Sequence, residues 1–401
     1  MKKIIDSIKY IKLSDLLSPF IFIIMIIPAS IFRLINNIKK RSLWLISEDG
    51  TTARDNGYCF YKYVRNKHPN DYCFYVIDKK CFDYNKVKEL GNIIQFKSLK
   101  HWLYYLAANY NISNQKHGNP NQPFFYVVHV FFGWFKNRVF LQHGITKDDA
   151  KWLYYKNTKF RYFVCGANKE YEYIKEKFGY PENNVIYTGF PRFDNLHNNN
   201  IKENQILIMP TWRNWLGRDT NNFGNKFYFK DTEFYKNWNS LLTNKKFIDF
   251  IEEKGLKVLF YPHINMQKFL KDFNMKSNQI EILSTNTDIQ DVLKQSSLLI
   301  TDYSSVYMDF AYMMKPIIYF QFDYEEYRKK QYQNGYFNYK RDGFGPVTCN
   351  VNDTINKFID IINNNLDNKY TKRMSDFFEL KDKNNCERIY SAIHNNQKKV
   401  V

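Results

Sequence analysis

Two alternating patterns run through most of this 401-residue sequence and limit the folds that it can form. From Ser42 onward, short runs of β-branched and aromatic residues alternate with segments that carry apolar residues at helical spacing. This alternation is typical of βαβ units, because each parallel strand needs a crossover, usually a helix, before the next strand. The predicted fold class is therefore α/β. The first half holds six strand candidates: SLWLIS, DYCFYVI, NIIQF, RVFLQ, RYFVCG and NVIYTG.

A polar stretch, DNLHNNNIKENQ at residues 194–205, interrupts the pattern and predicts a domain boundary. Single hydrophobic cores rarely grow past about 250 to 300 residues, so two cores are expected. We predict Rossmann-like domains over residues 41–200 and 201–375, and a C-terminal helix in residues 376–401 that is able to pack back on them. Five strand candidates form the second doubly wound unit: ILIMP, KVLFYPH, IEIL, SLLITD and PIIYF.

No G-x-G-x-x-G or Walker sequence is present, which argues against a nicotinamide or flavin enzyme. Two Rossmann-like halves without that fingerprint indicate a glycosyltransferase-B (GT-B) type architecture, in which two domains face a cleft.

The first 40 residues differ from the rest, because residues 16–35 are almost entirely apolar between basic flanks. A cleaved signal peptide is disfavoured by the basic downstream flank. Pro19, Pro28 and Arg33 shorten the apolar core below the roughly 20 residues of a spanning helix. A spanning helix is still possible on length, but an in-plane or re-entrant segment with its basic flanks on anionic headgroups fits best. A buried core helix is the remaining interpretation. The flanking residues are Lys2, Lys3, Lys9, Lys12, Lys39, Lys40 and Arg41.

The net charge of +19, from 59 Lys and Arg against 40 Asp and Glu, favours anionic partners: nucleic acid, anionic lipid or phosphorylated small molecules. No helix-turn-helix, RNP-type strand or zinc module is visible, so nucleic acid is not predicted. The six cysteines have no spacing typical of zinc ligands, and they are expected to be reduced thiols in the cytosol. We expect neither a metal nor a cofactor.

Polar residues follow several of the predicted strands, where the ligands of open α/β sheets bind. Serines at a helix N-terminus can help to hold a diphosphate, and Arg is suited to a bidentate grip on phosphate. Each residue also fits a plain structural role, such as a helix cap, a turn or a solvated surface charge. The candidates in the second half are Thr211, Arg213, His263, Asp302, Ser304 and Ser305, with Asp309 placed to reach a ribose or polyol hydroxyl.

In the first half, FLQHGITKDD sets His143 and Gly144 behind a strand, and YTGFPRFDNL places Arg192 in a Gly/Pro turn. Alone, His143 is more typical of a structural histidine. Arg192 fits equally a turn residue and a group that closes the cleft.

These motifs occur together in one order: His-Gly, Gly-x-Pro-Arg-x-Asp, Pro-Thr-Trp-Arg, Pro-His, and Thr-Asp-Tyr-Ser-Ser with a later Asp. That order resembles the CDP-glycerol glycerophosphotransferase family, which makes teichoic acids and related capsular polymers. The resemblance covers roughly residues 41–345, and ARDNGYCFYKY is similar to the family's Asp-Asn helix start.

The resemblance implies that CDP-glycerol lies on the second domain, with its diphosphate near Ser304, Ser305, Arg213 and His263. His143 would take the proton from a hydroxyl of a lipid-linked acceptor, a glycan or a polyol phosphate, and CMP would leave. A neutral imidazole suits this base role at cytosolic pH. The resemblance also implies a metal-independent site, and the expected location is the cytoplasmic face of the cell membrane.

The sequence departs from the family pattern after His143, where Gly144-Ile145-Thr146 replaces the common Gly-Thr-Pro. CDP-ribitol is therefore a rival donor. The same architecture also fits a nucleotide-sugar transferase, and the basic charge with the apolar segment also fits a non-catalytic membrane-binding protein. The acceptor and the oligomeric state are not predicted.

Overall fold

The computed structural model describes residues 13–116, 118–135, 137–197, 200–216, 229–284 and 287–397. Lys2, Lys3, Lys9 and Lys12, and residues 217–228 of the loop between Trp212 and Asn239, lie outside the described residues. The chain divides into two compact units. Unit 1 comprises the described residues of Met1–His143, Lys151–Asp194 and Asp382–Val401, and unit 2 those of Gly144–Ala150 and Asn195–Lys381.

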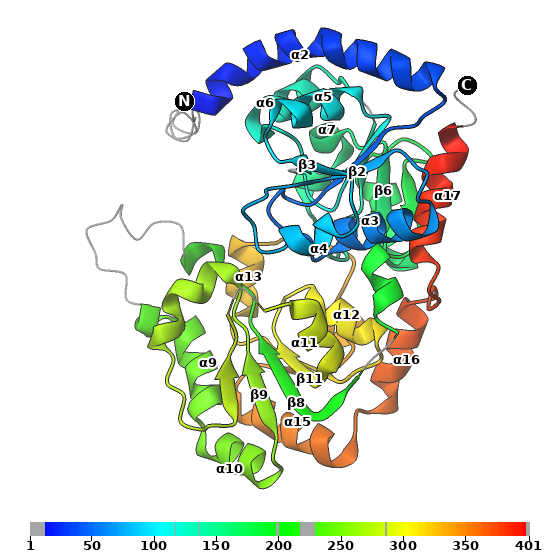
Figure 1. The fold of residues 1–401 in the computed structure, drawn as a ribbon. Helices are drawn as coiled ribbons and strands as arrows, with labels where there is room; N and C mark the ends of the chain where they lie inside the picture. The colour runs from blue at the N-terminus through cyan, green and yellow to red at the C-terminus, as the bar shows by residue number, and fades with distance from the viewer. Residues whose placement is uncertain are drawn as a thin grey trace. The chain divides into compact units, whose positions relative to one another are not determined.

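Unit 1 is built on a seven-stranded parallel sheet with the order β3-β2-β1-β4-β5-β6-β7. Figure 1 labels β2, β3 and β6 of this sheet. All six predicted strands are present, and β4 (YNIS) is an additional strand that lacks the β-branched and aromatic run of the others. The strands are β1 (Trp44–Ser47), β2 (Cys73–Ile77), β3 (Ile93–Gln95), β4 (Tyr110–Ser113), β5 (Arg138–Phe140), β6 (Tyr162–Cys165) and β7 (Val185–Tyr187). The helices are α2 (Leu13–Ile38), α3 (Asn56–Lys67), α4 (Tyr84–Lys88), α5 (Leu99–Ala107), α6 (Gln122–Tyr126), α7 (Tyr155–Thr158), α8 (Asn168–Lys177) and α17 (Asn385–Gln397).

Unit 2 is a six-stranded parallel sheet with the order β10-β9-β8-β11-β12-β13. The sequence predicted five strands and missed β13, which is only two residues long. The strands are β8 (Lys202–Met209), β9 (Lys257–Phe260), β10 (Ile280–Ile282), β11 (Ser296–Thr301), β12 (Ile317–Phe320) and β13 (Val347–Thr348). The helices are α9 (Glu233–Thr243), α10 (Lys245–Glu253), α11 (Ile289–Gln295), α12 (Val306–Tyr312), α13 (Tyr324–Lys330), α14 (Tyr339–Asp342), α15 (Val351–Asn364) and α16 (Asn368–Phe377).

The core of unit 2 shows why these segments form parallel strands. The strand β12 is buried along its whole length, as expected of a sheet that is covered by helices on both faces. Ile206, Ile300 and Ile318 from three neighbouring strands lie in one cluster with Trp238 of α9 and Phe358 of α15. Between β9 and β10 the chain forms a 3-10 helix, η6 (Ile264–Asp272).

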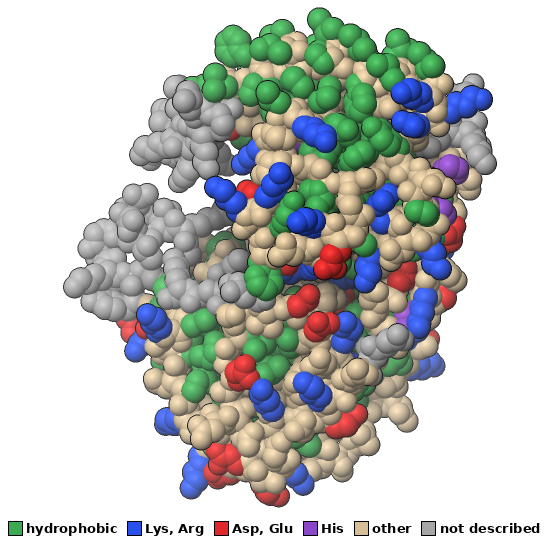
Figure 2. Space-filling model, in the orientation of Figure 1, with side chains coloured by type: hydrophobic (Ala, Val, Ile, Leu, Met, Phe, Trp, Pro, Cys, Tyr) green, Lys and Arg blue, Asp and Glu red, His purple; other side chains and the backbone are tan. Residues whose placement is uncertain are grey.

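The apolar N-terminal segment forms one helix, α2, which packs on α5 and α6 of unit 1. Phe22 and Ala29 are buried in a cluster with Trp102 and Phe125, and Arg33 donates to the carbonyl oxygen of Ala108 at 2.9 Å. The opposite side of the helix is apolar and exposed, and hydrophobic side chains gather over it in Figure 2. By length and composition Asp15–Ile38 could also cross a membrane.

Candidate functional site

His143 follows the end of β5 after a strained residue. Gln142 has a φ of 58°, in the left-handed region that residues other than glycine rarely adopt. Its side-chain Nε2 donates to the carbonyl oxygen of Val164 at 2.6 Å and to Oε1 of Glu170 at 3.0 Å. These two buried hydrogen bonds hold the turn that directs the His143 side chain.

Asn56, the first residue of α3, ties three segments of unit 1 together. Its Nδ2 donates to the carbonyl oxygen of Gln142 at 2.8 Å, and its Oδ1 accepts from the backbone N–H of Arg192 at 3.0 Å. The side chain is fully buried. One amide therefore joins the start of α3, the chain before His143 and the Gly/Pro turn.

Asp55, which precedes α3, holds the two groups that contact His143. Its Oδ1 accepts from Nη1 of Arg192 and its Oδ2 from Nδ2 of Asn114, both at 2.8 Å. Arg192 also donates to the carbonyl oxygen of His143 at 3.2 Å, and the backbone of Asn114 makes a hydrogen bond with the imidazole. Asp55 therefore fixes both the backbone and the ring of His143.

His143 is exposed to solvent, while the protein atoms around its imidazole reduce the hydration of the ring. Loss of hydration lowers the pKa of His143 below its ordinary value of 6.5; Asp55 raises that pKa and Arg192 lowers it. The net shift is downward, so the ring is neutral at pH 7 and can accept a proton.

Unit 2 contains a pocket of about 240 Å³ that gathers four of the predicted residues, Thr211, His263, Ser304 and Ser305. They follow β8, β9 and β11, which are neighbours at the point where the strand order reverses. Among the described residues, no hydrogen-bond partner faces Oγ1 of Thr211 or Nε1 of Trp212, and both atoms are buried. These two groups lie in residues of the pocket wall, and the hydroxyls of Ser304 and Ser305 in the same lining can donate to the oxygens of an anion.

The tautomer of His263 follows from its hydrogen bond. Its Nδ1 accepts from the backbone N–H of Asn265 at 3.2 Å, which places the proton of the neutral ring on Nε2. Burial lowers the pKa of His263. A neutral His263 can therefore donate one hydrogen bond into the pocket from Nε2.

The loop after His143, whose sequence departs from the family pattern, belongs to unit 2 and lines this pocket. Lys147 donates to Oδ2 of Asp148 and to the carbonyl oxygen of Tyr303, both at 3.1 Å, and Arg328 donates to Oδ1 of Asp148 at 2.5 Å. A Cβ on Gly144 would lie 2.7 Å from Oγ of Ser305. An alanine at this position would therefore require the Ser305 side chain to move.

Arg213 is not among the pocket residues, although the sequence predicted that it grips phosphate. Its guanidinium is fully buried and forms ion pairs with Asp302 at 2.8 Å and Asp323 at 2.7 Å. Asp302 also accepts from the backbone N–H groups of Thr211 and Tyr303. These contacts make Arg213 and Asp302 supports of the loops that carry Thr211 and Ser304.

Asp309 is 1% exposed within α12 and is not among the residues that line the pocket. Arg192 is 4% exposed, and it contacts Asn56, Asp55 and the carbonyl oxygen of His143. In the described ranges, no group of three or more His, Cys, Asp or Glu side chains is arranged to hold a metal ion.

Sequence reasoning missed Trp212 as a donor and the support that Asp148 receives from Arg328. It noticed Asp55 and Asn56 only as a similar helix start. Two polar residues at the start of an amphipathic helix indicate a helix cap. That pattern does not reveal that Asp55 and Asn56 contact residues 114, 142 and 192.

The two parallel sheets and the strand-end pocket define a GT-B-like α/β protein. The structure is similar to that of the wall teichoic acid polymerase TagF, with a TM-score of 0.62 and 17% identity, over 94% of this chain and 98% of that chain. It is also similar to a UDP-GlcNAc 2-epimerase from Neisseria meningitidis bound to UDP-GlcNAc, with a TM-score of 0.53 and 11% identity, over 88% of this chain and 100% of that one. These likenesses concern the fold.

The family model for CDP-glycerol:poly(glycerophosphate) glycerophosphotransferase matches residues 29–395, and the chain belongs to this family. It is 34% identical over 365 residues to the minor teichoic acid biosynthesis protein GgaB of Bacillus subtilis (strain 168), covering 88% of this chain and 40% of GgaB. It is 24% identical over 354 residues to the teichoic acid poly(glycerol phosphate) polymerase of the same strain, covering 79% of this chain and 43% of that protein. The chain thus spans less than half the length of these two relatives.

Proposed function

We propose that this protein transfers glycerol phosphate from CDP-glycerol to a hydroxyl of a lipid-linked acceptor and releases CMP. The observation that carries the proposal is the pocket of unit 2, where Thr211, His263, Ser304 and Ser305 meet in a chain of this family. Hydroxyl, indole and imidazole donors around a small pocket suit the oxygens of a diphosphate. This donor set is compatible with other CDP-polyols as well.

In the proposed reaction, the acceptor oxygen attacks the phosphorus that carries glycerol, and the bond from that phosphorus to the bridging oxygen of the diphosphate breaks. The acceptor proton passes to the neutral imidazole of His143, and CMP leaves with the bonding electron pair. One peptide bond joins His143 to Gly144, and Ile145, the next residue, lines the pocket. This short connection supports the assignment of His143 and the pocket of unit 2 to one reaction.

The protein's work in such a transfer is positioning and stabilisation of charge on the phosphoryl oxygens. The Nε2 proton of His263, the hydroxyls of Ser304 and Ser305, and the unpaired donors of Thr211 and Trp212 would supply that stabilisation. Arg213 and Asp302 would act indirectly, by holding the loops that carry these donors.

The exposed side of α2 supports a membrane location, at the cytoplasmic face where a cytosolic nucleotide donor is accessible. Phe20, Ile24 and Ile27 are each about two-thirds exposed, and Phe131, also in unit 1, is 75% exposed. Apolar area of this size on a helix with a buried inner face fits a helix that lies in the membrane plane. A lipid-linked acceptor would then be delivered on the same surface.

The test is a panel of donors with purified protein and a membrane extract as the source of acceptor. CMP release from CDP-glycerol, detected by mass spectrometry, supports the proposal. Release from CDP-ribitol alone reassigns the polyol, and release of UDP from UDP-sugars without CMP overturns it. His143→Ala should lower the rate about 100-fold or more, while its unfolding midpoint stays close to that of the parent protein. Unchanged turnover in that variant would remove His143 as the base. If neither the variant nor the parent protein is active with any donor, a non-catalytic membrane-binding role is favoured.

A further inference from the structure

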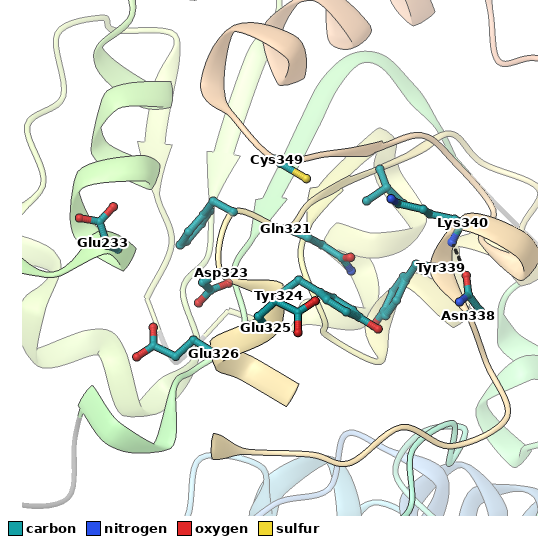
Figure 3. A pocket seen from close by; sticks show the side chains of 12 residues that line it. Glu233, Gln321, Asp323, Tyr324, Glu325, Glu326, Asn338, Tyr339, Lys340 and Cys349 are labelled. Carbon is teal, nitrogen blue, oxygen red and sulfur yellow. Dashed lines mark hydrogen bonds between the residues drawn. The ribbon is translucent and has the colours of Figure 1, made fainter. Parts of the chain in front are cut away.

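Arg33 of α2 is a cation without a carboxylate partner in the described part of the chain. It is also the only charged residue between Asp15 and Lys39. The charges at the larger hollow of unit 2, about 710 Å³ beyond the ends of β12 and β13, are different (Figure 3). There the carboxylates of Glu233, Asp323 and Glu326 each form an ion pair with a nearby Lys or Arg. The charge of Arg33 is therefore the one that calls for an external partner.

Arg33 lines a hollow of about 480 Å³ in unit 1, between α2 and the segment that precedes β5. Its Nη2 donates to the carbonyl oxygen of Ala108 at 2.9 Å, and its other N–H groups have no partner among the described residues. None of these nitrogens is a buried atom, so solvent reaches them. Arg33 can therefore donate to a ligand in the hollow. The other lining residues are Ile26, Trp134, Phe135 and Asn137.

This hollow lies at the border between the buried and the exposed side of α2. Ile26 and Arg33 are about two helical turns apart and half-buried, whereas Ile27 and Leu34, which follow them, are 66% and 59% exposed. Figure 2 shows Lys and Arg side chains at the edge of the hydrophobic side chains that gather over α2. When such a helix lies in the membrane plane, its exposed side enters the acyl chains and its borders lie at the level of the headgroups. Arg33 would then lie at the level of the lipid phosphates.

The chemistry of the hollow favours a phosphate that is attached to hydrocarbon. An unpaired charge is costly to remove from water, and lipids that cover this surface would remove water from Arg33. A guanidinium with free N–H groups is suited to phosphate oxygens. Ile26, Trp134 and Phe135 add apolar walls, which free phosphate cannot use.

We propose that this hollow binds the phosphate of one anionic phospholipid, such as phosphatidylglycerol. Arg33 would donate to the phosphate oxygens, and the acyl chains would lie along Ile26 and the exposed side of α2. The inference rests on the proposed membrane location of α2, and it adds a defined lipid site to the general attraction of the +19 charge. It does not depend on the transfer chemistry.

Dihexanoyl phosphatidylglycerol, kept below its micelle concentration, tests the inference with the full chain. Binding is followed by ³¹P NMR line broadening, without donor, acceptor or vesicles, so a failed transfer assay leaves this result unaffected. We expect the lipid to bind the parent protein, and Arg33→Gln to weaken that binding about tenfold or more. Inorganic phosphate, the second probe, should show no binding that depends on Arg33. Absence of lipid binding, or equal dependence of both probes on Arg33, overturns the proposal.

Two further variants locate the lipid. Arg41→Gln removes an exposed cation just after α2 and is the matched control, which should bind the lipid as the parent does. Ile26→Trp keeps the charge of Arg33 and fills the hollow, so it should also weaken binding about tenfold or more. Arg33→Gln should fold, because Nδ2 of Asn137 also donates to the carbonyl oxygen of Ala108, at 2.6 Å. If Arg33→Gln and Ile26→Trp keep the parental unfolding midpoint and the parental lipid affinity, the hollow is not the site.

Discussion

At the scale of single residues, His143 depends on a carboxylate that does not touch it. Asp55 binds Arg192 and Asn114, which contact the carbonyl oxygen and the ring of His143 respectively. Glu48 accepts from the backbone N–H of Asp55 at 2.8 Å, and burial together with the charge of Asp55 raises the pKa of Glu48 to about 7. Glu48, which is buried, and Asp55, which is partly exposed, thus form a linked pair of carboxylates next to the residues that contact the proposed base.

The pH dependence of the reaction should report the lowered pKa of His143. Because the folded pKa lies below 6.5, the neutral base predominates at pH 7 and is lost as the pH falls through that lowered value. We expect log(kcat/KM) for the CDP-polyol donor to be flat from about pH 7 to 8 and to decline below about pH 6.5. A decline that begins above pH 7 would contradict this assignment.

Asp55→Asn should slow the transfer and shift the acid decline of log(kcat/KM) to lower pH. The carboxylate raises the pKa of His143, so its removal lowers that pKa and shifts the acid limb to lower pH. The loss of a charged partner for Arg192 should also reduce kcat about tenfold or more. The measurement is the pH profile of the variant beside that of the parent. A lower kcat without a shift in the acid limb of the pH profile would indicate that Asp55 has a purely structural role.

Arg213→Met should act mainly on stability. Its removal leaves the buried carboxylates of Asp302 and Asp323 without their cation, a change that typically costs about 3–5 kcal/mol. Urea unfolding should show a lower midpoint with an unchanged slope. If the variant instead unfolds like the parent and only the KM for the donor rises, Arg213 acts directly on phosphate.

The candidate residues could be predicted from the sequence where strand ends bring them together. Thr211, His263, Ser304 and Ser305 lie in one pocket because parallel strands end at the same edge of a sheet. The burial of Arg213 could not be predicted, because its partner Asp323 is 110 residues away and follows another strand. Local patterns report which side chains follow a strand, and they do not report which tertiary partners those side chains find.

At the scale of elements, α2 has two apolar sides with different environments. One side packs on α5 and α6, and the other is exposed together with Phe131, Phe132 and Trp134. The sequence predicted an apolar segment with basic flanks, and an 18-residue window of this kind does not distinguish a spanning helix from one that lies flat. The partly buried hydrogen bond from Arg33 to the carbonyl oxygen of Ala108 supports the helix that lies flat.

A double variant of the exposed side, Ile23→Asp with Ile27→Asp, should abolish binding to vesicles. Both side chains are about two-thirds exposed and lie one helical turn apart, so folding should be little affected. The loss of two apolar side chains and the gain of two charges should lower partitioning to anionic vesicles at least about tenfold. The measurement is co-sedimentation, and Ile201→Asp, at an exposed isoleucine of unit 2, is the control. Equal sedimentation of the double variant and the control would exclude α2 as the docking element.

The elements missed from the sequence are the short ones. β4 contains Asn111 and Ser113, and its place is set by pairing with β1 and β5 on either side. β13 has two residues and pairs only with β12. In both cases the neighbouring strands supply the hydrogen bonds that fix the segment, so the local pattern carries little information.

At the scale of the whole molecule, the chain passes between its two units more than once. Residues 144–150 belong to unit 2 although unit 1 continues on both sides of them, and α17 packs on α3 of unit 1. Composition predicts a polar break near residues 194–205, but it cannot predict which unit a short loop joins. That choice depends on contacts such as Lys147 with the carbonyl oxygen of Tyr303, 156 residues later.

The net charge of +19 and the apolar side of α2 should make separable contributions to membrane binding. Each Lys or Arg near an anionic surface contributes about 1 kcal/mol, and the Debye length falls from about 10 Å at 0.1 M salt to about 3 Å at 1 M. Binding to vesicles with anionic lipid should therefore weaken steeply as salt rises and then level off above zero, because the apolar contact is not screened. Neutral phosphatidylcholine vesicles should give that residual level at all salt concentrations. Complete release by salt would assign the attachment to charge alone, whereas the plateau requires insertion of the exposed side of α2.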